Sequence, residues 1–418
     1  MSKVLLHSLV FSPDGVSTAY LMTELALELK RLGYSVTVLT TTPHFNVVQE
    51  VAIRQSMRKY WFGLVYYSEL EGIPIWHVKV PDKGKRIWMR MFDFIRFHLV
   101  SMLVAFRKIG IQNIVISTSP PLTIALVSWL LGVLWKAPTV YKVAELYPDL
   151  AIRQGMVKSR FFIAFLRWLE KFIYKKTTVI VPIAEQFRRV IKQRGVPDNK
   201  LRMIPDFVDT KLFCPKERKN KFSLNNDLLD EFIVLYAGNI GIVQDWDSVL
   251  FAAEKLSNLP IKFVIIGDGS KRQWLMKEVE VRRLKKVTIL EYQSKELMPE
   301  INASCDIGII PMTLAGSKDG VPSKIYSILS CAKPVVAQVD DDSELRWIVE
   351  QSGCGRIVPI ADRQAFSDAI LKAFRERELL PAEGLKGRNY VEKNYSKEAI
   401  SGKYDELIRE VQYKNNQI

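Results

Sequence analysis

Residues 4–40, VLLHSLVFSPDGVSTAYLMTELALELKRLGYSVTVLT, decide the fold class. Residues 4–10 form a short apolar run, which predicts a buried strand. Leucines at helical spacing over residues 21–32 predict a helix, and Gly33 marks its end. A second apolar run at residues 35–40 predicts another strand. This order of strand, helix and strand is the repeating unit of a parallel sheet.

The same alternation continues along the rest of the chain. Apolar runs recur at residues 114–117, 139–143 and 178–182, separated by helical stretches, as expected for a parallel sheet buried on both faces. A polar, lysine-rich stretch at residues 215–226 precedes a second series. Its predicted strands are residues 232–236, 261–266, 288–290, 307–310 and 334–337, and its predicted helices are residues 248–256 and 271–283. We therefore predict two doubly wound α/β domains, which bind ligands at the carboxyl ends of their strands.

Length and composition agree with this organisation. The 418 residues are too many for one compact core and suit two α/β domains that face a cleft. The formal charge of +15 requires an anionic partner, which could be a nucleic acid, a nucleotide substrate or an acidic membrane. We do not expect nucleic-acid binding, because the chain has no zinc-finger spacing and no aromatic-basic RNA-binding signature.

The N-terminus and the cysteines give expectations about the compartment. The first ten residues resemble a strand and lack the basic leader and cleavage site of a secretory signal, so we expect a protein that stays in the cytoplasm. The cysteines lie far apart and suggest neither a zinc site nor a disulfide framework, so we expect reduced, structural thiols. They are Cys214, Cys305, Cys331 and Cys354.

Two glycine loops in the second half follow predicted strands directly. These loops are Gly238-Asn239-Ile240-Gly241 and Gly267-Asp268-Gly269. Glycine lets backbone N–H groups approach a phosphate closely at the start of a helix. The alternative, that the glycines only allow tight turns, remains open for each loop alone. Two such loops in one domain favour phosphate binding.

A longer motif lies in the same half. The run DGVPSKIYS at residues 319–327 is followed by CAKPVVA at residues 331–337. Together they resemble the donor-binding segment of the family 4 retaining glycosyltransferases, which share the two-domain GT-B fold. Further matches occur in the same order along nearly the whole chain. They include residues 12–15, 204–209, 236–241, 267–269, 303–306 and 353–355.

The resemblance implies a domain arrangement. It implies an N-terminal acceptor-binding Rossmann-like domain at residues 1–210 and a linker at residues 211–228. The C-terminal nucleotide-sugar-binding Rossmann-like domain then covers residues 229–395, and a helix at residues 396–418 returns to the first domain.

The chain departs from the family pattern at positions that carry chemistry. Asp319 and Ser327 stand where the family usually has two glutamates, and Ser327 offers fewer hydrogen bonds to a ribose than a carboxylate does. Asn239 and Gln244 replace an Arg and a Lys that usually neutralise the diphosphate. Ala144 stands where relatives often have a histidine.

The resemblance also implies site residues. Lys324 is the remaining cation for the leaving diphosphate, although it could also be a solvated lysine at a helix end. Glu145 is expected to face the cleft, although it could merely offset a helix dipole. The expected catalytic residues are Glu145, Lys324 and Asp319; the donor-binding residues are Gly238, Asn239, Gln244, Gly267, Asp268, Gly269, Gly320, Val321, Pro322, Ser323 and Ser327; the acceptor-binding residues are Gly15, Lys142 and Tyr147.

A membrane contact is a further expectation. Residues 83–107 mix basic side chains with large apolar ones, which is typical of a helix at a membrane interface, although a core-packed helix with a charged outer face would look similar. The apolar run at residues 122–135 is too short to span a bilayer. We therefore expect a cytoplasmic protein that touches the inner face of an anionic membrane, and a lipid-linked acceptor would suit such a contact.

The implied reaction is transfer of a sugar, with retention, from a nucleotide sugar to an acceptor, without a metal or a cofactor. No Asp-x-Asp metal motif follows the predicted strands. Two alternatives use the same fold: a nucleotide-sugar epimerase and a non-catalytic donor-binding subunit. A nicotinamide-dependent enzyme is disfavoured, because neither glycine loop completes the six-residue dinucleotide fingerprint.

Overall fold

The computed structural model describes residues 1–80, 87–153, 155–415 and 417, apart from the side chains of residues 87–92 and of Asp319. The chain divides into two compact units. The first unit contains residues 1–206 and 400–418, and the second contains residues 207–399. The prediction of two α/β domains with parallel sheets is confirmed.

The first unit is built on an eight-stranded sheet in the order β3-β4-β5-β2-β1-β6-β7-β8. The six strands from β5 to β8 in this order are parallel, whereas β4 runs antiparallel to both of its neighbours. The strands are β1 (Lys3–His7), β2 (Ser35–Thr41), β3 (Arg58–Tyr60), β4 (Val65–Leu70), β5 (Ile73–Val78), β6 (Ile114–Thr118), β7 (Thr139–Val143) and β8 (Val179–Pro182).

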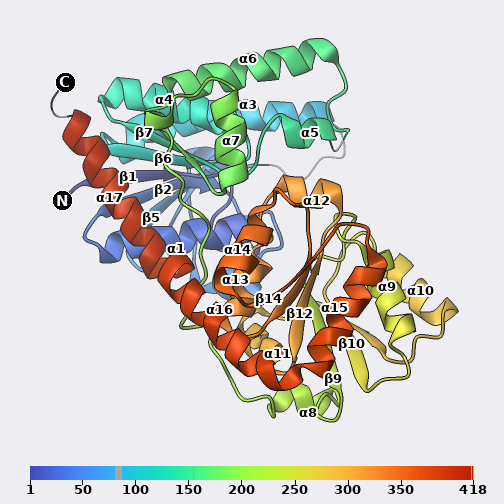
Figure 1. The fold of residues 1–418 in the computed structure, drawn as a ribbon. Helices are drawn as coiled ribbons and strands as arrows, with labels where there is room; N and C mark the ends of the chain where they lie inside the picture. The colour runs from blue at the N-terminus through green and yellow to red at the C-terminus, as the bar shows by residue number, and fades with distance from the viewer. Residues whose placement is uncertain (81–86, 154, 416, 418) are drawn as a thin grey trace. The chain divides into compact units, whose positions relative to one another are not determined.

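Helices cover both faces of this sheet. In Figure 1, α3, α4 and α6 lie on one side of the sheet and α1 lies on the other. The helices are α1 (Ser17–Arg31), α2 (Gln49–Arg54), α3 (Ile87–Val104), α4 (Ile124–Trp135), α5 (Asp149–Arg153), α6 (Arg160–Lys176) and α7 (Glu185–Gln193). Among the described residues, no helix is long and apolar enough to cross a bilayer.

Strand β1 is shorter than the apolar run that predicts it. The ladder ends at His7, because Ser8 turns the chain by donating its hydroxyl to the Val10 carbonyl at 2.7 Å. The residues that follow are therefore free to form the loop that reaches Gly15. The antiparallel strands β3 and β4 and the strand β5 were not predicted from the sequence.

The second unit contains a six-stranded parallel sheet in the order β11-β10-β9-β12-β13-β14. Apolar clusters lie on both faces of it, one with α9, α10 and α15 and the other with α13, α14 and α16. The strands are β9 (Phe232–Ala237), β10 (Ile261–Ile266), β11 (Val287–Leu290), β12 (Ile307–Pro311), β13 (Val335–Gln338) and β14 (Gly355–Val358). The helices are α8 (Lys221–Asn225), α9 (Trp246–Lys255), α10 (Arg272–Val281), α11 (Met298–Ala303), α12 (Leu314–Asp319), α13 (Lys324–Ser330), α14 (Glu344–Ser352), α15 (Arg363–Arg375) and α16 (Leu380–Tyr395).

Residues 211–228, expected to be a linker, pack against the second unit instead. Phe222 of α8 is buried in an apolar cluster with strands β9 and β10. Arg218 pairs with Asp306 at 2.7 Å. The low apolar content of this stretch predicted a linker. One buried phenylalanine and one ion pair are nevertheless enough to hold the stretch against the second unit.

The last helix, α17 (Lys397–Asn415), joins the first unit from Ile400 onward. Its buried face contributes apolar side chains to that unit. Its polar side chains reach the first unit as well: the Tyr34 hydroxyl donates to Asp405 at 2.6 Å, and Arg202 pairs with Glu410 at 2.7 Å. The expected return of the C-terminal helix is therefore confirmed.

The four cysteines are free thiols, as the sequence suggests. Cys305, Cys331 and Cys354 are buried, and burial raises the pKa of each thiol to about 12. These three side chains are therefore neutral apolar fillers of the second unit.

Candidate functional site

The two glycine loops follow neighbouring strands of the second unit. Gly238 comes after β9 and Gly267 comes after β10, and both have positive φ angles, at 143° and 146°. A Cβ at Gly267 would lie 1.9 Å from the Gly238 carbonyl oxygen, so the two loops touch through their backbones. Only glycine allows this approach.

The third segment at this edge follows strand β12, which lies on the other side of β9. It contains α12, the turn at residues 320–323 and the start of α13. The strand order therefore brings the sequence-predicted segments 238–241, 267–269 and 320–324 to one edge of the sheet. At such a switch point the loops diverge and leave room for a ligand.

Lys324 is the cation of this edge. Its Nζ lies 3.6 Å from the centre of the Tyr236 ring. A Cβ at Gly238 would be only 2.9 Å from that Nζ, so the ammonium lies against the backbone of the first glycine loop. Burial lowers the pKa of the Lys324 ammonium to about 7.

Within the described part of the chain, Lys324 has no ion-pair partner. Among the described residues, its Nζ forms no hydrogen bond and no ion pair. A half-buried ammonium that lacks a counter-ion is costly and is stabilised by an anion. The backbone N–H groups of Val321, Ser323 and Lys324 likewise have no acceptor in the described part of the chain. This arrangement of donors favours a bound anion.

Tyr236 and Trp246 organise the first glycine loop, and neither was among the predicted site residues. The buried Tyr236 hydroxyl donates to the Asn239 carbonyl at 2.5 Å, and Trp246 Nε1 donates to the Gly241 carbonyl at 2.9 Å. The two rings meet edge-on at 4.8 Å. The signal that could have found them is an aromatic residue at each end of the glycine loop.

The remaining expected donor residues have varied positions. Gln244 accepts from the Gly241 N–H at 3.1 Å, and Ser327 donates its hydroxyl to the Lys324 carbonyl at 3.0 Å. Both side chains therefore form hydrogen bonds with nearby backbone groups. Asn239 and Asp268 are exposed, as is Ser323, whereas Val321 and Pro322 are half-buried. Gly320, with φ 155°, ends α12. The Asp319 side chain lies outside the described residues.

Glu145 lies at the carboxyl end of strand β7 in the first unit. Ser119, at the end of the neighbouring strand β6, accepts from the N–H groups of Ala144 (2.9 Å) and Glu145 (3.1 Å). It also donates to the Glu145 carbonyl at 3.3 Å. Ser119 therefore fixes the backbone of Glu145, which is half-buried. Ser119 was not among the residues predicted for the site.

Tyr147 is a half-buried neighbour of Glu145. Burial, together with the negative charge of Glu145, raises the pKa of its phenol to about 12. The phenol therefore stays protonated and can donate a hydrogen bond near the carboxylate.

Lys142 was expected to contact the acceptor, but its side chain has an internal partner. The residue is only 3% exposed, and its Nζ donates to Asp206 at 2.7 Å. Burial lowers the pKa of the ammonium, but the Asp206 carboxylate outweighs that effect and the net pKa is raised. We therefore treat Lys142 as a structural cation. The neighbouring Asp209 caps a turn, since it accepts from the N–H groups of residues 211 and 212.

Gly15 lies under a loop of the first unit. A Cβ there would be 2.3 Å from the Asn46 carbonyl, so the position requires glycine. The buried Asp14 holds the same loop, because its Oδ1 accepts from the N–H groups of His44 and Phe45 at 2.7 Å each. Burial raises the pKa of Asp14.

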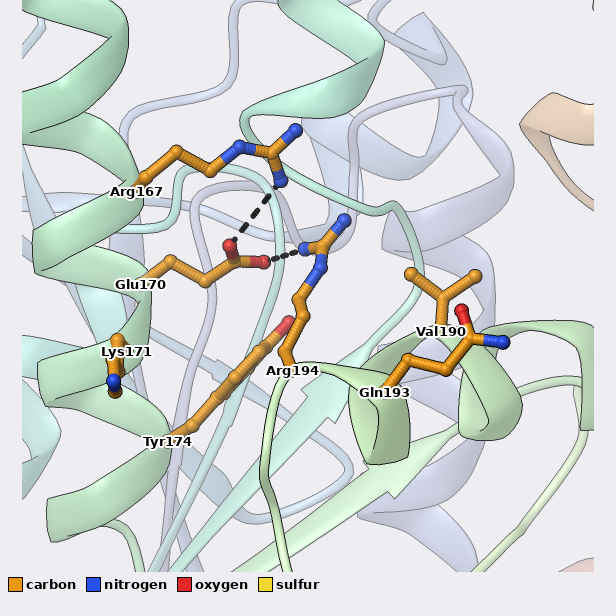
Figure 2. A pocket seen from close by; sticks show the side chains of 7 residues that line it. All are labelled: Arg167, Glu170, Lys171, Tyr174, Val190, Gln193 and Arg194. Atoms are coloured by element: carbon orange, nitrogen blue, oxygen red, sulfur yellow. Dashed lines mark hydrogen bonds and ion pairs between the residues drawn. The ribbon is translucent and has the colours of Figure 1, made fainter.

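A cavity of about 450 Å³ lies elsewhere in the first unit, between α6 and α7. Figure 2 shows its charged lining, in which Glu170 lies between Arg167 and Arg194. Asp149 binds the same two arginines. Because these charges neutralise one another, the cavity is an ion-pair cluster that joins α6 to α7. None of the residues that line it is a sequence-predicted site residue.

A metal site was not expected. In the described part of the chain, no group of three His, Cys, Asp or Glu side chains could hold a metal ion.

Two family models match the chain. The glycosyl transferases group 1 model covers residues 217–409, and the glycosyl transferase 4-like domain model covers residues 18–206. Together they span most of the sequence and correspond to the two units.

Full-length relatives and solved structures agree with these models. The chain is 23% identical to WcaI of Escherichia coli K12, named as a putative colanic acid biosynthesis glycosyl transferase, over 97% of this chain and 100% of the relative. It is 25% identical to the probable glycosyltransferase WbjE of Pseudomonas aeruginosa, over 71% and 74%.

Among solved structures, HepE of Anabaena in complex with UDP and glucose has a TM-score of 0.72 at 13% identity, covering 98% of this chain and 100% of that one. Sucrose-phosphate synthase of Thermosynechococcus elongatus has a TM-score of 0.73 at 15% identity, covering 99% and 100%. At these identities the likeness establishes the fold.

Proposed function

The chain belongs to the group 1 glycosyltransferases of the GT-B fold, and we propose that it transfers a sugar, with retention, from a nucleotide-sugar donor. The observation that carries the proposal is Lys324. It is a half-buried ammonium with no counter-ion among the described residues, beside two glycine loops at one edge of the second sheet. A nucleoside diphosphate provides the anion that this site lacks.

In the proposed complex, Lys324 and the N–H groups of Val321 and Ser323 bind the diphosphate. The donor base and ribose lie along the segments after β9, β10 and β12. Anabaena HepE has been solved in complex with UDP and with UDP-glucose, which supports the same class of donor here. We assign Asp319 to the sugar hydroxyls, as the family motif implies.

Bond breaking at the anomeric carbon releases the nucleoside diphosphate, and negative charge grows on the leaving phosphate oxygen. Lys324 is placed to stabilise that charge, as fixed donors do in an oxyanion site. The acceptor oxygen forms its bond on the same face of the sugar, and its proton passes to the leaving phosphate. The Glu145 carboxylate accepts a hydrogen bond from the acceptor hydroxyl and so orients it, and the protonated Tyr147 phenol donates a hydrogen bond to the acceptor. The reaction as proposed needs no metal and no cofactor.

We further propose a lipid-linked acceptor and a role in polysaccharide synthesis, with peripheral contact to an anionic membrane. The charge of +15 supports the membrane contact, and the name of the E. coli relative supports the pathway class. Residues 83–107 were expected to touch the membrane, but residues 83–86 and the side chains up to residue 92 lie outside the described residues. In the described part of α3, Phe97 is buried, whereas Ile95 and Leu99 are exposed.

A thermal-shift screen of nucleotide sugars tests the donor assignment. A ligand at 100 times its dissociation constant adds about 2.7 kcal/mol of stability, which raises Tm measurably. The same ligand should shift Lys324→Ala less and should shift Lys277→Ala, a change of an exposed lysine on α10, as much as wild type. A screen in which no nucleotide sugar raises Tm would contradict the proposal.

A further inference from the structure

The first half of helix α6 exposes a row of aromatic side chains. Phe161, Phe165 and Trp168 are 91%, 50% and 60% exposed, and Phe162 is exposed as well. We call these four residues the aromatic face of α6. None of the first nine residues of this helix is buried, so the face is not part of the core of the unit.

The rings form a continuous stack along the helix. Phe162 stacks on Phe165 at 6.3 Å, Phe165 on Trp168 at 5.9 Å, and Trp168 on Phe172 at 5.8 Å between centroids. Phe172 then meets Trp129 of α4 edge-on at 5.2 Å. The stack therefore runs from the exposed start of α6 to the body of the unit and gives the face a fixed shape.

The second half of α6 is anchored firmly. Leu169 and Ile173 are buried, and the Glu170 carboxylate pairs with Arg194, which follows α7 (Figure 2). Asp149 of α5 pairs with both Arg167 and Arg194. Because these contacts fix the helix from one side, the aromatic face cannot turn inward to become buried. In Figure 1, α6 is the outermost helix of the layer that it forms with α3 and α4.

The charges around the face have one sign. Lys158 and Arg160 lie at the start of the helix, and Lys171, Lys175 and Lys176 continue along it. The helix has one acid, Glu170, which is buried and paired. A second copy of the chain on this face would bring like charges together, whereas an anionic surface would be attracted.

We infer that the aromatic face of α6 docks the first unit on a membrane that carries anionic phospholipid headgroups. Large aromatic side chains with basic neighbours are typical of helices that lie in the interface between headgroups and acyl chains. In the docked state the Phe161, Phe165 and Trp168 rings enter that interface, and the lysines pair with lipid phosphates. The inference deepens the membrane contact of the proposed function and assigns it to α6, independently of the donor site.

Co-sedimentation with lipid vesicles tests this inference. The full chain is expected to bind vesicles of phosphatidylcholine mixed with phosphatidylglycerol, to bind pure phosphatidylcholine poorly, and to dissociate as salt rises. Changing Phe161, Phe165 and Trp168 together to Ser should weaken binding by at least about tenfold. The double change Lys171→Glu and Lys175→Glu should abolish the preference for the anionic lipid.

A matched control changes three exposed apolar residues of the second unit, Met276, Val281 and Leu385, to Ser. This control should bind vesicles as wild type does. Circular dichroism and the Tm shift produced by the nucleotide sugar verify that each variant is folded and report the proposed donor site separately. Vesicle binding that survives the aromatic change, or no binding by wild type, would overturn the inference. A wild-type dimer that becomes monomeric in the aromatic variant would overturn it in favour of a second copy.

Discussion

The Nζ of Lys324 lies 3.6 Å above the centre of the Tyr236 ring, beside the backbone of Gly238. Tyr236 is a neutral partner: the ring attracts the cation but supplies no counter-charge. Burial against this ring and the glycine loop lowers the pKa of the ammonium to about 7. The charge of this proposed anion-binding site therefore varies near neutral pH.

The first prediction is a pH dependence of donor-site binding. Lys324 is charged below its pKa of about 7 and neutral above it, so affinity for a nucleoside diphosphate should fall by up to about tenfold per pH unit above that value. Calorimetric titration over about pH 6 to 9 measures the profile. Lys324→Arg should bind with a flat profile, because the guanidinium stays charged. A wild-type affinity that does not change with pH would show that Lys324 does not bind the diphosphate.

The second prediction concerns Glu145. Glu145→Gln should reduce kcat by about 100-fold, because loss of precise positioning of the acceptor hydroxyl costs on that scale, and should leave donor affinity unchanged. Glu406→Gln, a change of an exposed acid on α17, is the matched control and should retain wild-type kinetics. If both variants turn over equally fast, Glu145 only offsets a helix dipole.

The third prediction is that activity survives chelation. The proposed site holds the diphosphate with Lys324 and backbone N–H groups, so EDTA should leave the initial rate unchanged. Loss of turnover in EDTA that magnesium or manganese restores would contradict the proposal.

The fourth prediction separates a structural role for Lys142 from an acceptor-binding role. Lys142→Met leaves Asp206 partly buried without its partner, which should cost about 3 to 5 kcal/mol of unfolding free energy, measured by urea denaturation. The double variant with Asp206→Leu should recover part of that loss, because both charges are then removed. If the Lys142→Met variant is stable but has a raised KM for the acceptor, Lys142 binds the acceptor and is not a structural cation.

The fifth prediction is a loss of stability in mild acid. Burial lowers the pKa of His7 to about 3 and the pKa values of His77 and His98 to about 4. The unfolded chain therefore binds more protons below pH 6.5, and stability that is complete above this pH is lost as pH falls toward the folded pKa values. Three such groups give a slope approaching about 4 kcal/mol per pH unit.

Urea denaturation at several pH values between about 7 and 5 measures this slope. Replacing His98 with Gln should reduce it by about a third, since one titrating group is removed. A wild-type stability that stays constant over this range would show that the three imidazoles take up protons equally in the folded and unfolded states.

The parallel strands were predictable because each is buried on both faces and is therefore a continuous apolar run. Strands β3 and β4 were missed for the converse reason. They form an antiparallel edge in which Arg58 and Lys59 are exposed, so no apolar run marks them. Strand β5 begins Ile73-Pro74, and a proline argues against a strand unless tertiary context decides otherwise.

The site was predictable where a motif lies within one segment. The glycine loops and Lys324 were identified in this way. Ser119 and Tyr236 were missed, because their importance comes from contacts with Glu145 and Lys324, which are distant in sequence. Lys142 was predicted to bind the acceptor for the same reason, because its ion-pair partner Asp206 belongs to a later segment of the chain.

Helix α17 has a consequence for how the chain folds during synthesis. Ile400, Tyr404 and Ile408 are buried parts of the first unit, yet the ribosome adds them after the whole second unit. Until then, the surface that receives them is exposed, and Tyr34 lacks its partner Asp405. The nascent first unit therefore remains incomplete while the second unit is translated, and chaperones that bind exposed apolar surface have their longest opportunity to act during that interval.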